Sequence, residues 1–226
     1  MLAEEESLNG EKTMGFKNDT KHSCPRVIVY GATGFDYIAK VKCFPRPDDK
    51  IRTDPLVSMG GGNAANTATA LCRLGLPVQL ISKIGDDNMA ATLREELARD
   101  GVDTSLLFSC KDAHSPMTYV IVDTENNTRT CLHTPLREDI TLAEVQQIIR
   151  EEEGKDSPAW IHFDSRHTAS SVVYAANALK AKVPLSVDAE KLRPGLETLL
   201  SSCAVIFTNQ HFPSIFCTTK TETDTG

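Results

Sequence analysis

The sequence predicts an α/β protein built on a mostly parallel sheet, with a smaller sheet beside it. Short apolar, β-branched runs alternate along the chain with amphipathic helical segments, as parallel strands and their right-handed crossover helices do. Two stretches depart from that alternation: a pair of half-exposed strands at 37–44 and 50–58, and a hairpin at 117–134. Because both break the pattern, we expect them to form the second sheet.

The elements of the parallel part follow one another in the order strand, helix, strand. The predicted strands are RVIVYG (26–31), PVQLISKIG (77–85), AWIHFD (159–164), PLSVDAE (184–190) and AVIFTN (204–209). The predicted helices cover 64–74, 88–101, 141–153, 169–182 and 195–202. Gly75 and Gly101 follow the apolar periodicity of the first two helices and are expected to end them.

Composition and charge exclude several classes of protein. The chain has 226 residues, enough for one well-buried domain, and a formal net charge of −7. That charge argues against nucleic acid or an anionic membrane surface as a partner. No apolar run reaches membrane-spanning length. The seven cysteines form no C-x-x-C pair and the N-terminus is polar and acidic, so we expect reduced thiols in a cytoplasmic protein.

The two ends of the chain differ in character from its middle. Residues 1–25 are polar and acidic, and we expect a disordered lead-in there. The end, residues 213–226, is rich in threonine, and we expect an irregular tail. A single domain is therefore predicted over 26–212.

The stretch SMGGGNAANTATALCRLG, residues 58–75, joins a glycine-rich loop to a helix. It lacks the lysine and hydroxyl of a triphosphate-binding loop. Asn63 and Asn66 are three residues apart at the helix start and share one side of its first turn. Two carboxamides suit neighbouring hydroxyl groups of a neutral polyol. The alternative is that Asn63 only caps the helix.

Acidic residues follow three of the predicted strands. Asp36 comes after the first strand, where ligand crevices form in open α/β sheets, and is either a ligand to hydroxyls or a solvated loop acid. Asp188 and Glu190 are candidates to hold magnesium through water, or to cap the next segment. Asp86 and Asp87 are interpreted as the start of a helix.

The segment YGATGF, residues 30–35, superficially fits a dinucleotide-binding turn. Gly31 and Gly34 match such a fingerprint, but Tyr37 stands where its third glycine belongs, and strand rather than helix follows. A nicotinamide-nucleotide binder is therefore the lowest-ranked function.

Together, three segments resemble the PfkB, or ribokinase-like, carbohydrate kinases, and most of all the ketohexokinases. They are MGGGNAANTATALCRLG, SPMTYVIVDTENNTRT and LSVDAEKLRPGLETLL. The resemblance covers about 26–212. It implies a three-layer α/β/α core with a small β-sheet lid, and transfer of the ATP γ-phosphoryl to a sugar hydroxyl with Mg²⁺. A fructose-like ketohexose is the expected acceptor.

The resemblance also implies roles for single residues. The positions matching the sugar site are Asp36, Gly62, Asn63, Asn66 and Arg129, with Asp48 as an acid supplied across a dimer. Asn209 matches the start of a nucleotide-side N-x-x-E element, although Phe212 stands in place of its acid. Such lids pair into homodimers, and we expect Ile38, Val41, Tyr119 and Ile121 to form the apolar surface for that contact.

The second signature of the family, D-T-x-G-A-G-D, does not occur in this sequence. The resemblance is thus to the N-terminal two-thirds of such a kinase, a C-terminally truncated version of the fold. Because that signature supplies the catalytic aspartate and an anion hole, we expect the chain alone to be inactive. The alternative function is a non-catalytic sugar-binding or dimerising regulatory module.

Overall fold

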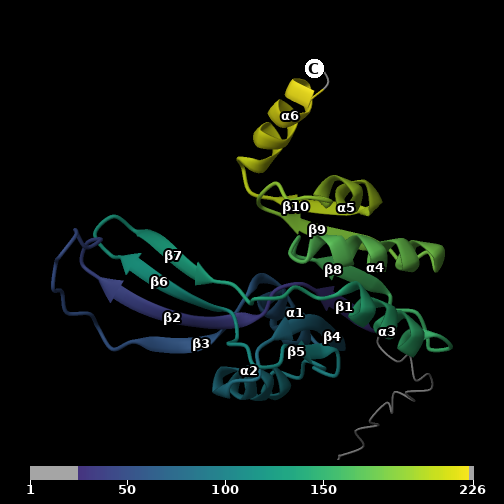
Figure 1. Cartoon of the computed structure of the whole chain (residues 1–226), viewed down its shortest axis with the longest axis horizontal. Coiled ribbons are helices and arrows are strands. Elements are labelled where there is room, and N and C mark those ends of the chain that lie inside the picture. The colour runs from purple at the N-terminus through teal and green to yellow at the C-terminus, as the bar shows by residue number, and fades with distance from the viewer. Residues whose placement is uncertain (1–24, 224–226) are drawn as a thin grey trace, which may run out of the picture.

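The computed structural model describes residues 25–223, with side chains as far as Cys217. The predicted disordered lead-in, 1–25, lies outside the described residues apart from Pro25, as does the end of the tail, 224–226. Two sheets make up the described chain. One is the core sheet, covered by helices, and the other is a four-stranded lid that extends away from the core (Figure 1).

All neighbouring strands of the core sheet run parallel, in the order β10-β9-β8-β1-β4-β5. They are β1 (Val27–Tyr30), β4 (Val78–Ile84), β5 (Leu107–Ser109), β8 (Trp160–Phe163), β9 (Leu185–Ala189) and β10 (Val205–Thr208). The predicted parallel sheet is confirmed. The sequence does not predict β5, because three residues are too few to show a period.

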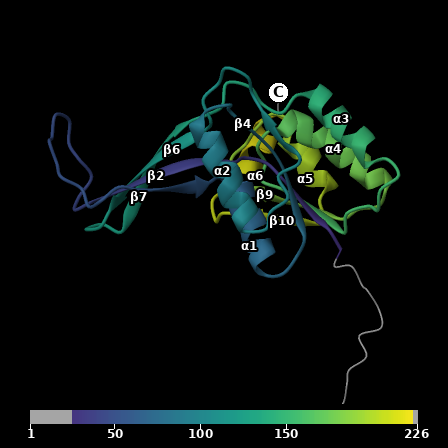
Figure 2. The same cartoon turned by 90° about the horizontal axis from the view of Figure 1, so that it is seen from below.

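Helices cover both faces of this sheet and make three layers (Figure 2). They are α1 (Asn63–Arg73), α2 (Asn88–Arg99), α3 (Leu142–Glu152), α4 (Thr168–Lys180) and α5 (Leu196–Ser202). Alternate residues of β1 face opposite ways: Val29 belongs to the apolar cluster of α1 and α2, and Ile28 to that of α3, α4 and α5.

Local sequence sets the ends of these helices. Gly75 and Gly101 follow α1 and α2 with φ of 91° and 86°, so each occupies the left-handed conformation that ends a helix, as predicted. The helix α3 begins with a capping box, in which Thr141 and Glu144 each bond to the backbone N–H of the other.

The lid contains four strands in the order β3-β2-β6-β7. They are β2 (Gly34–Val41), β3 (Val57–Gly61), β6 (Met117–Asp123) and β7 (Thr128–Thr134). The predicted hairpin at 117–134 is confirmed. The strand predicted at 50–58 is wrong in its bounds, since β3 begins only at Val57 and the segment 42–56 is irregular. Three prolines in that segment explain this, because proline cannot donate to a sheet ladder.

The prediction that one exposed apolar face of the lid contains Ile38, Val41, Tyr119 and Ile121 is also wrong. Ile38 pairs with Val120, so it lies on the opposite face of the lid from Tyr119 and Ile121. Val41 is only 6% exposed. The lid remains apolar on both faces, with Val57 and Met59 exposed on the Ile38 face and Tyr119 and Leu132 on the other.

A buried lysine of the core sheet binds the segment that leads back from the lid. Lys83 of β4 is 3% exposed and forms ion pairs with Glu144 at 3.0 Å and Glu138 at 3.3 Å. Its ammonium group also donates to the carbonyl oxygen of Asp139. Since residues 135–141 connect β7 to α3, these contacts hold the returning end of the lid against the sheet.

The tail predicted to be irregular contains a helix instead, α6 (Phe212–Thr223), which points away from the core in Figure 1. Asn209 caps its first turn, because its side-chain oxygen accepts from the amides of His211 and Phe212. Phe212 is buried and stacks on Phe216 one turn later. The prediction of an irregular tail used only its threonine-rich composition, which does not show this cap or this packing.

Candidate functional site

Asp36 lies on β2 and points toward the start of α1. Its carboxylate fills the space that a side chain on Gly61 would need. Gly61 is the last residue of β3, and only Gly62 separates it from α1. At Gly62 a Cβ would lie 2.6 Å from the carbonyl oxygen of Ala32, with φ at 96°, so glycine is required there. The glycine-rich loop therefore serves to bring strand, carboxylate and helix together.

Neighbouring lid strands hold the Asp36 carboxylate in place. Asp36, Thr118 and His133 are paired across β2, β6 and β7 and share one face of the lid. The hydroxyl of Thr118 lies 3.1 Å from Nδ1 of His133. Burial raises the pKa of Asp36, while the Thr118 hydrogen bond and the charge of His133 act against it.

The two asparagines of the loop have side chains available to a ligand. The interpretation of Asn63 as a helix cap is wrong, since Gly62 is the N-cap residue and Asn63 begins the helix. Among the residues the structure describes, neither Asn63 nor Asn66 has a side-chain hydrogen bond. Asn63 is half-buried and Asn66 is exposed. Both lie on the first turn of α1, which begins two residues after Gly61.

The backbone amides at the start of α1 are occupied by the protein itself. The amide of Ala64 donates to Asp164 at 3.2 Å, that of Ala65 to the Ala32 carbonyl, and that of Asn66 to the Gly62 carbonyl. These three amides are therefore not free to bind a phosphate. The absence of a triphosphate motif in the sequence agrees with this geometry.

Asp164 is a central residue that the sequence analysis does not single out. It follows β8, is 1% exposed, and accepts from the amides of Ala32, Ala64 and Arg166. Gly31 leaves room for it, since a Cβ there would overlap its carboxylate. Burial raises the pKa of Asp164, and the backbone hydrogen bonds act against that rise. The sequence does contain a pattern that could have indicated Asp164, namely an acidic residue directly after a buried strand.

Further charged side chains gather where β8 and β9 end. Arg166 lies after β8, and its guanidinium group is 3.8 Å from Glu190. Asp188 is the last but one residue of β9, and burial, then the negative charges of Glu190 and Asp164, raise its pKa. Carboxylates of this kind suit Mg²⁺ held through water. No cluster of three or more potential metal ligands occurs within the described part of the chain.

Three of the predicted site residues lie apart from Asp36. Arg129 is paired with Val122, four residues beyond Thr118 and about 13 Å along the lid. Asp48 is exposed in the irregular segment 42–56. Asn209 caps α6 and its side-chain nitrogen donates to the carbonyl of Glu190. Of the predicted site residues, Gly62, Asn63 and Asn66 lie directly after Gly61, next to which the Asp36 carboxylate lies, whereas Arg129 and Asp48 lie elsewhere on the lid.

The dinucleotide interpretation of YGATGF is wrong, because the turn after β1 leads directly into strand β2 rather than into a helix. The dinucleotide fingerprint needs a helix there, whose amino end receives the pyrophosphate. Tyr37 lies within that strand, with its ring stacked on Tyr119.

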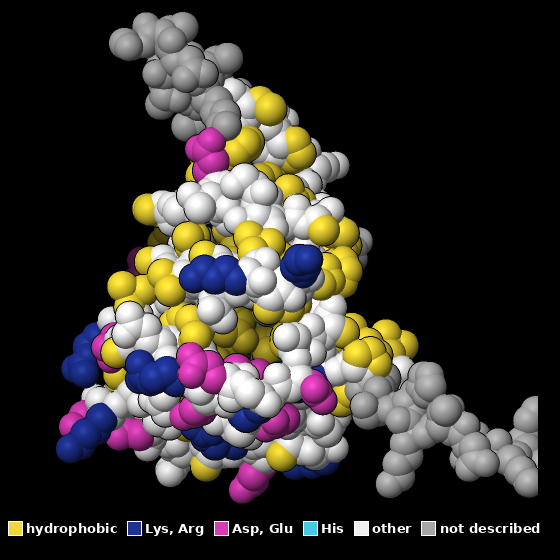
Figure 3. Space-filling view, turned by 90° about the vertical axis from the view of Figure 1, so that its right-hand side faces the viewer, with side chains coloured by type: hydrophobic (Ala, Val, Ile, Leu, Met, Phe, Trp, Pro, Cys, Tyr) yellow, Lys and Arg dark blue, Asp and Glu magenta, His cyan; other side chains and the backbone are white. Residues whose placement is uncertain are grey.

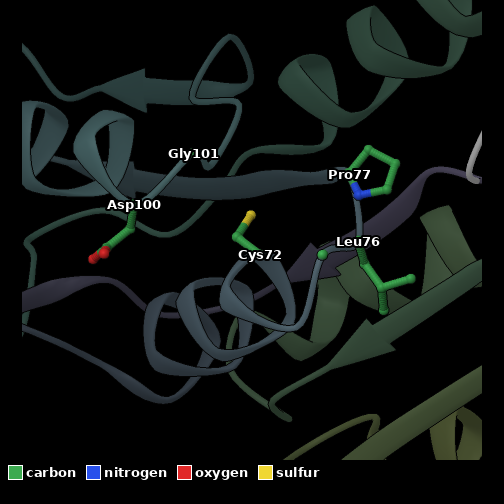
Figure 4. A pocket seen from close by; sticks show the side chains of 6 residues that line it. Cys72, Leu76, Pro77, Asp100 and Gly101 are labelled. Carbon is green, nitrogen blue, oxygen red and sulfur yellow. The ribbon is translucent and has the colours of Figure 1, made fainter. Parts of the chain in front are cut away.

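Two hollows lie far from Asp36, at the amino ends of the core strands. A shallow one of about 530 Å³ lies between the ends of α1 and α2, with Cys72 and Asp100 at its sides (Figure 4). Another of about 150 Å³ lies between α3 and α4 and includes Tyr174, at the end of the molecule that faces the viewer in Figure 3. Ligand sites of open α/β sheets form at the carboxyl ends instead, which favours the lid side.

Comparison with known proteins agrees with this arrangement. The model of the pfkB family carbohydrate kinases matches residues 25–225. The chain belongs to this family. A nucleoside kinase of Methanothermobacter thermautotrophicus is 33% identical over 101 residues, 45% of this chain and 33% of its own length. The ketohexokinase of Mus musculus is 26% identical over 193 residues, 82% of this chain and 63% of its own.

Solved pfkB-type structures share the fold. Arabidopsis thaliana ribokinase, in complex with ribose and ATP, superposes with a TM-score of 0.67 at 18% identity, over 83% of this chain and 61% of that one. The ribokinase-like three-layer core is thereby confirmed. The chain spans between one-third and two-thirds of the length of these relatives. No helix in the described range is long and apolar enough to cross a membrane.

Proposed function

We propose that this chain forms the acceptor-binding part of an ATP-dependent sugar kinase. The observation that supports this most is the position of Asp36, whose carboxylate lies next to Gly61, two residues before Asn63 begins α1. A carboxylate and a carboxamide on a rigid strand and helix can fix neighbouring hydroxyls of a sugar. A ketohexose such as fructose is the proposed acceptor, since the match to a ketohexokinase extends over 82% of this chain.

In this mechanism the residues of the chain bind and orient the acceptor. Asp36 accepts from two hydroxyls, and Asn63 and Asn66 fix the face of the sugar that meets the γ-phosphoryl of ATP. Mg²⁺, when bound, neutralises charge on the phosphates, and Asp188 and Glu190 would hold it through water. The lid covers the sugar and keeps water away from the transferred group.

The proton of the attacking hydroxyl needs a base, which the family places in the G-A-G-D segment. That segment does not occur in these 226 residues, and Asp36 serves in binding. We therefore expect the chain by itself to bind sugar without transferring phosphate. Its role by itself is then that of a sugar-binding or dimerising module.

We also propose that the lid pairs with the lid of a second copy. Support comes from its exposed apolar side chains, with Val57 and Met59 each close to half exposed on the Asp36 face. Sedimentation should show a dimer that Val57→Asp on this face dissociates, while Leu132→Asp on the opposite face leaves it intact. A wild-type monomer at high concentration contradicts the pairing.

Ligand-dependent stability and turnover, measured side by side, test the proposed function. D-fructose should raise the melting temperature of the wild type and of the control Asp54→Ala, an exposed acid in the irregular lid segment, but not that of Asp36→Ala. With Mg-ATP added, ADP should stay at background. Turnover of about 1–100 per second, usual for kinases, would show that the missing segment is dispensable.

A further inference from the structure

A small hollow between the helices α3 and α4 plays no part in the sugar site. Its volume is about 150 Å³, and its wall is completed by residues 155–158, which precede β8, and by Val183, which precedes β9. The hollow therefore lies at the amino ends of these strands, whereas the sugar is expected beyond their carboxyl ends, on the side of Asp36. A molecule bound in the hollow would be a second ligand.

The bottom of the hollow is hydrophobic. Ile161, Ala178 and Val183 line it and are each at most 5% exposed, and Ile149 and Ala181 add further aliphatic surface. Figure 3 views the molecule from this end and shows hydrophobic side chains inside a hollow, with charged side chains around it. An apolar cavity of similar volume can hold one benzene molecule. The hollow is thus large enough for a hydrocarbon body of about six to eight non-hydrogen atoms.

One polar group inside the hollow has no partner. Tyr174 of α4 lines the hollow and is 4% exposed, but its hydroxyl forms no hydrogen bond with any residue that the structure describes. The neighbouring buried tyrosine, Tyr30, bonds to Ser170 at 2.8 Å. Buried hydroxyl groups nearly always have such a partner. Tyr174 therefore offers an unused donor and acceptor to a molecule in the hollow.

The rim of the hollow is acidic. Three acids line it, Glu152, Glu153 and Asp156, together with one cation, Lys155. Glu152 is already paired, with Arg26 and Lys155. Glu153 and Asp156 are exposed, and neither has an ion pair within the described residues. The carboxyl end of α3 adds the partial negative charge of its last carbonyl groups. The rim therefore favours a cation over an anion.

We propose that this hollow binds a small organic ammonium ion. Its hydrocarbon body lies against Ile161 and Val183, and its ammonium group donates to the hydroxyl of Tyr174, with the unpaired carboxylates of the rim nearby. A neutral alcohol could use the hydroxyl but not the charge of the rim, and a carboxylate would meet like charge. The proposal does not depend on the proposed function, because no residue of the hollow belongs to the sugar site.

Titration of the full chain, followed through the NMR signals of its backbone amides, tests this proposal. The ligand is benzylamine, and benzyl alcohol and benzoate are its neutral and anionic counterparts of similar size. Each is added to the wild type, Tyr174→Phe, Glu153→Gln and Glu151→Gln. Tyr174→Phe removes the hydroxyl and keeps the ring. Glu151→Gln is the control, because Glu151 is an exposed acid two residues from Glu153 that does not line the hollow.

Benzylamine should shift the amide signals of Tyr174 and Asn177 in a saturable way. It should bind at least about fivefold more tightly than benzyl alcohol, as one exposed charge contact would give. Tyr174→Phe should weaken benzylamine binding about tenfold, yet melt at the wild-type temperature, since its hydroxyl has no protein partner to lose. Glu153→Gln should reduce the preference for benzylamine over benzyl alcohol, and Glu151→Gln should leave it unchanged.

Three results would overturn the proposal. A hollow that holds only water gives no saturable shift at Tyr174 with any of the three compounds. Equal binding of benzylamine and benzyl alcohol would show that the acidic rim selects nothing. An unchanged affinity in Tyr174→Phe would show that the unpaired hydroxyl is not a ligand group.

Discussion

The carboxylate of Asp36 occupies the space that a side chain at Gly61 would need. Asp36 is on β2 and Gly61 ends the neighbouring strand β3, so the two residues meet across a single strand pair. Gly61 is also two residues from the first residue of α1. Glycine at 61 is therefore what leaves room for the carboxylate next to the loop that leads into α1.

Gly61→Ala should destabilise the protein by about 1–3 kcal/mol, the range for overpacking. The cost should shrink when Asp36 is replaced by alanine as well, because the clash is with its carboxylate. Urea unfolding of the two single variants and the double variant measures this coupling. Gly60→Ala is the control, since there a Cβ meets the end of the Glu96 side chain and not Asp36, so its cost should be the same with and without Asp36. An equal cost of Gly61→Ala with and without Asp36 contradicts the geometry.

Thr118→Val should weaken sugar binding about tenfold, the effect of losing one hydrogen bond to a charged group. The substitution keeps the shape of the side chain but removes the hydroxyl between Asp36 and His133. Thr130→Val is the matched control on the opposite face of the lid, where Thr130 pairs with Ile121. Titration calorimetry with the best ligand provides the measurement. An effect of the same size in both variants would mean that the lid as a whole, not this contact, was changed.

Asp87 should make the free energy of unfolding depend on pH in the acid range. Burial raises its pKa, but hydrogen bonds from the backbone and hydroxyl of Ser115 and from the Ala90 amide outweigh it, so the net pKa is lowered. Because the pKa of Asp87 is lower in the folded than in the unfolded protein, its ionised carboxylate stabilises the fold at pH values above the unfolded-state pKa of 3.8. That stabilisation is lost as the pH falls through the folded-state pKa.

Asp87→Ala should therefore cost about 1 kcal/mol near neutral pH, as loss of an N-cap does. The difference from the wild type should shrink below about pH 4. Denaturant unfolding at pH 7 and pH 3 checks this, with Glu95→Ala on the exposed side of α2 as control. A difference that stays constant between the two pH values counts against the assignment.

The features that sequence predicted are those that a local pattern encodes. Alternation of apolar strands and amphipathic helices gave the core sheet, and glycines at 75 and 101 gave two helix ends. The proposed grouping of Asp36, Asn63 and Asn66 rests in the same way on their places after a strand and at a helix start. Each of these rests on residues close together in the chain.

The features that sequence missed depend on contacts between distant residues. Asp164 joins the ends of β1, α1 and β8, and its partners Ala32 and Ala64 are remote in sequence. Val41 stands between Lys40 and Lys42, and only packing in the folded lid shows that it is buried. The helix α6 depends on the cap by Asn209 and on burial of Phe212, against a threonine-rich composition.

The most direct measurement of the central claim is a titration of sugars into the wild type and Asp36→Ala. D-fructose, D-ribose, and their 6- and 5-phosphates form the ligand set, with Asp54→Ala as the control variant. We predict that at least one of them binds the wild type and Asp54→Ala alike. Its affinity for Asp36→Ala should be lower by tenfold or more, since the lost hydrogen bonds are to a charge. Absence of binding by every sugar, or equal binding to wild type and Asp36→Ala, would contradict the account.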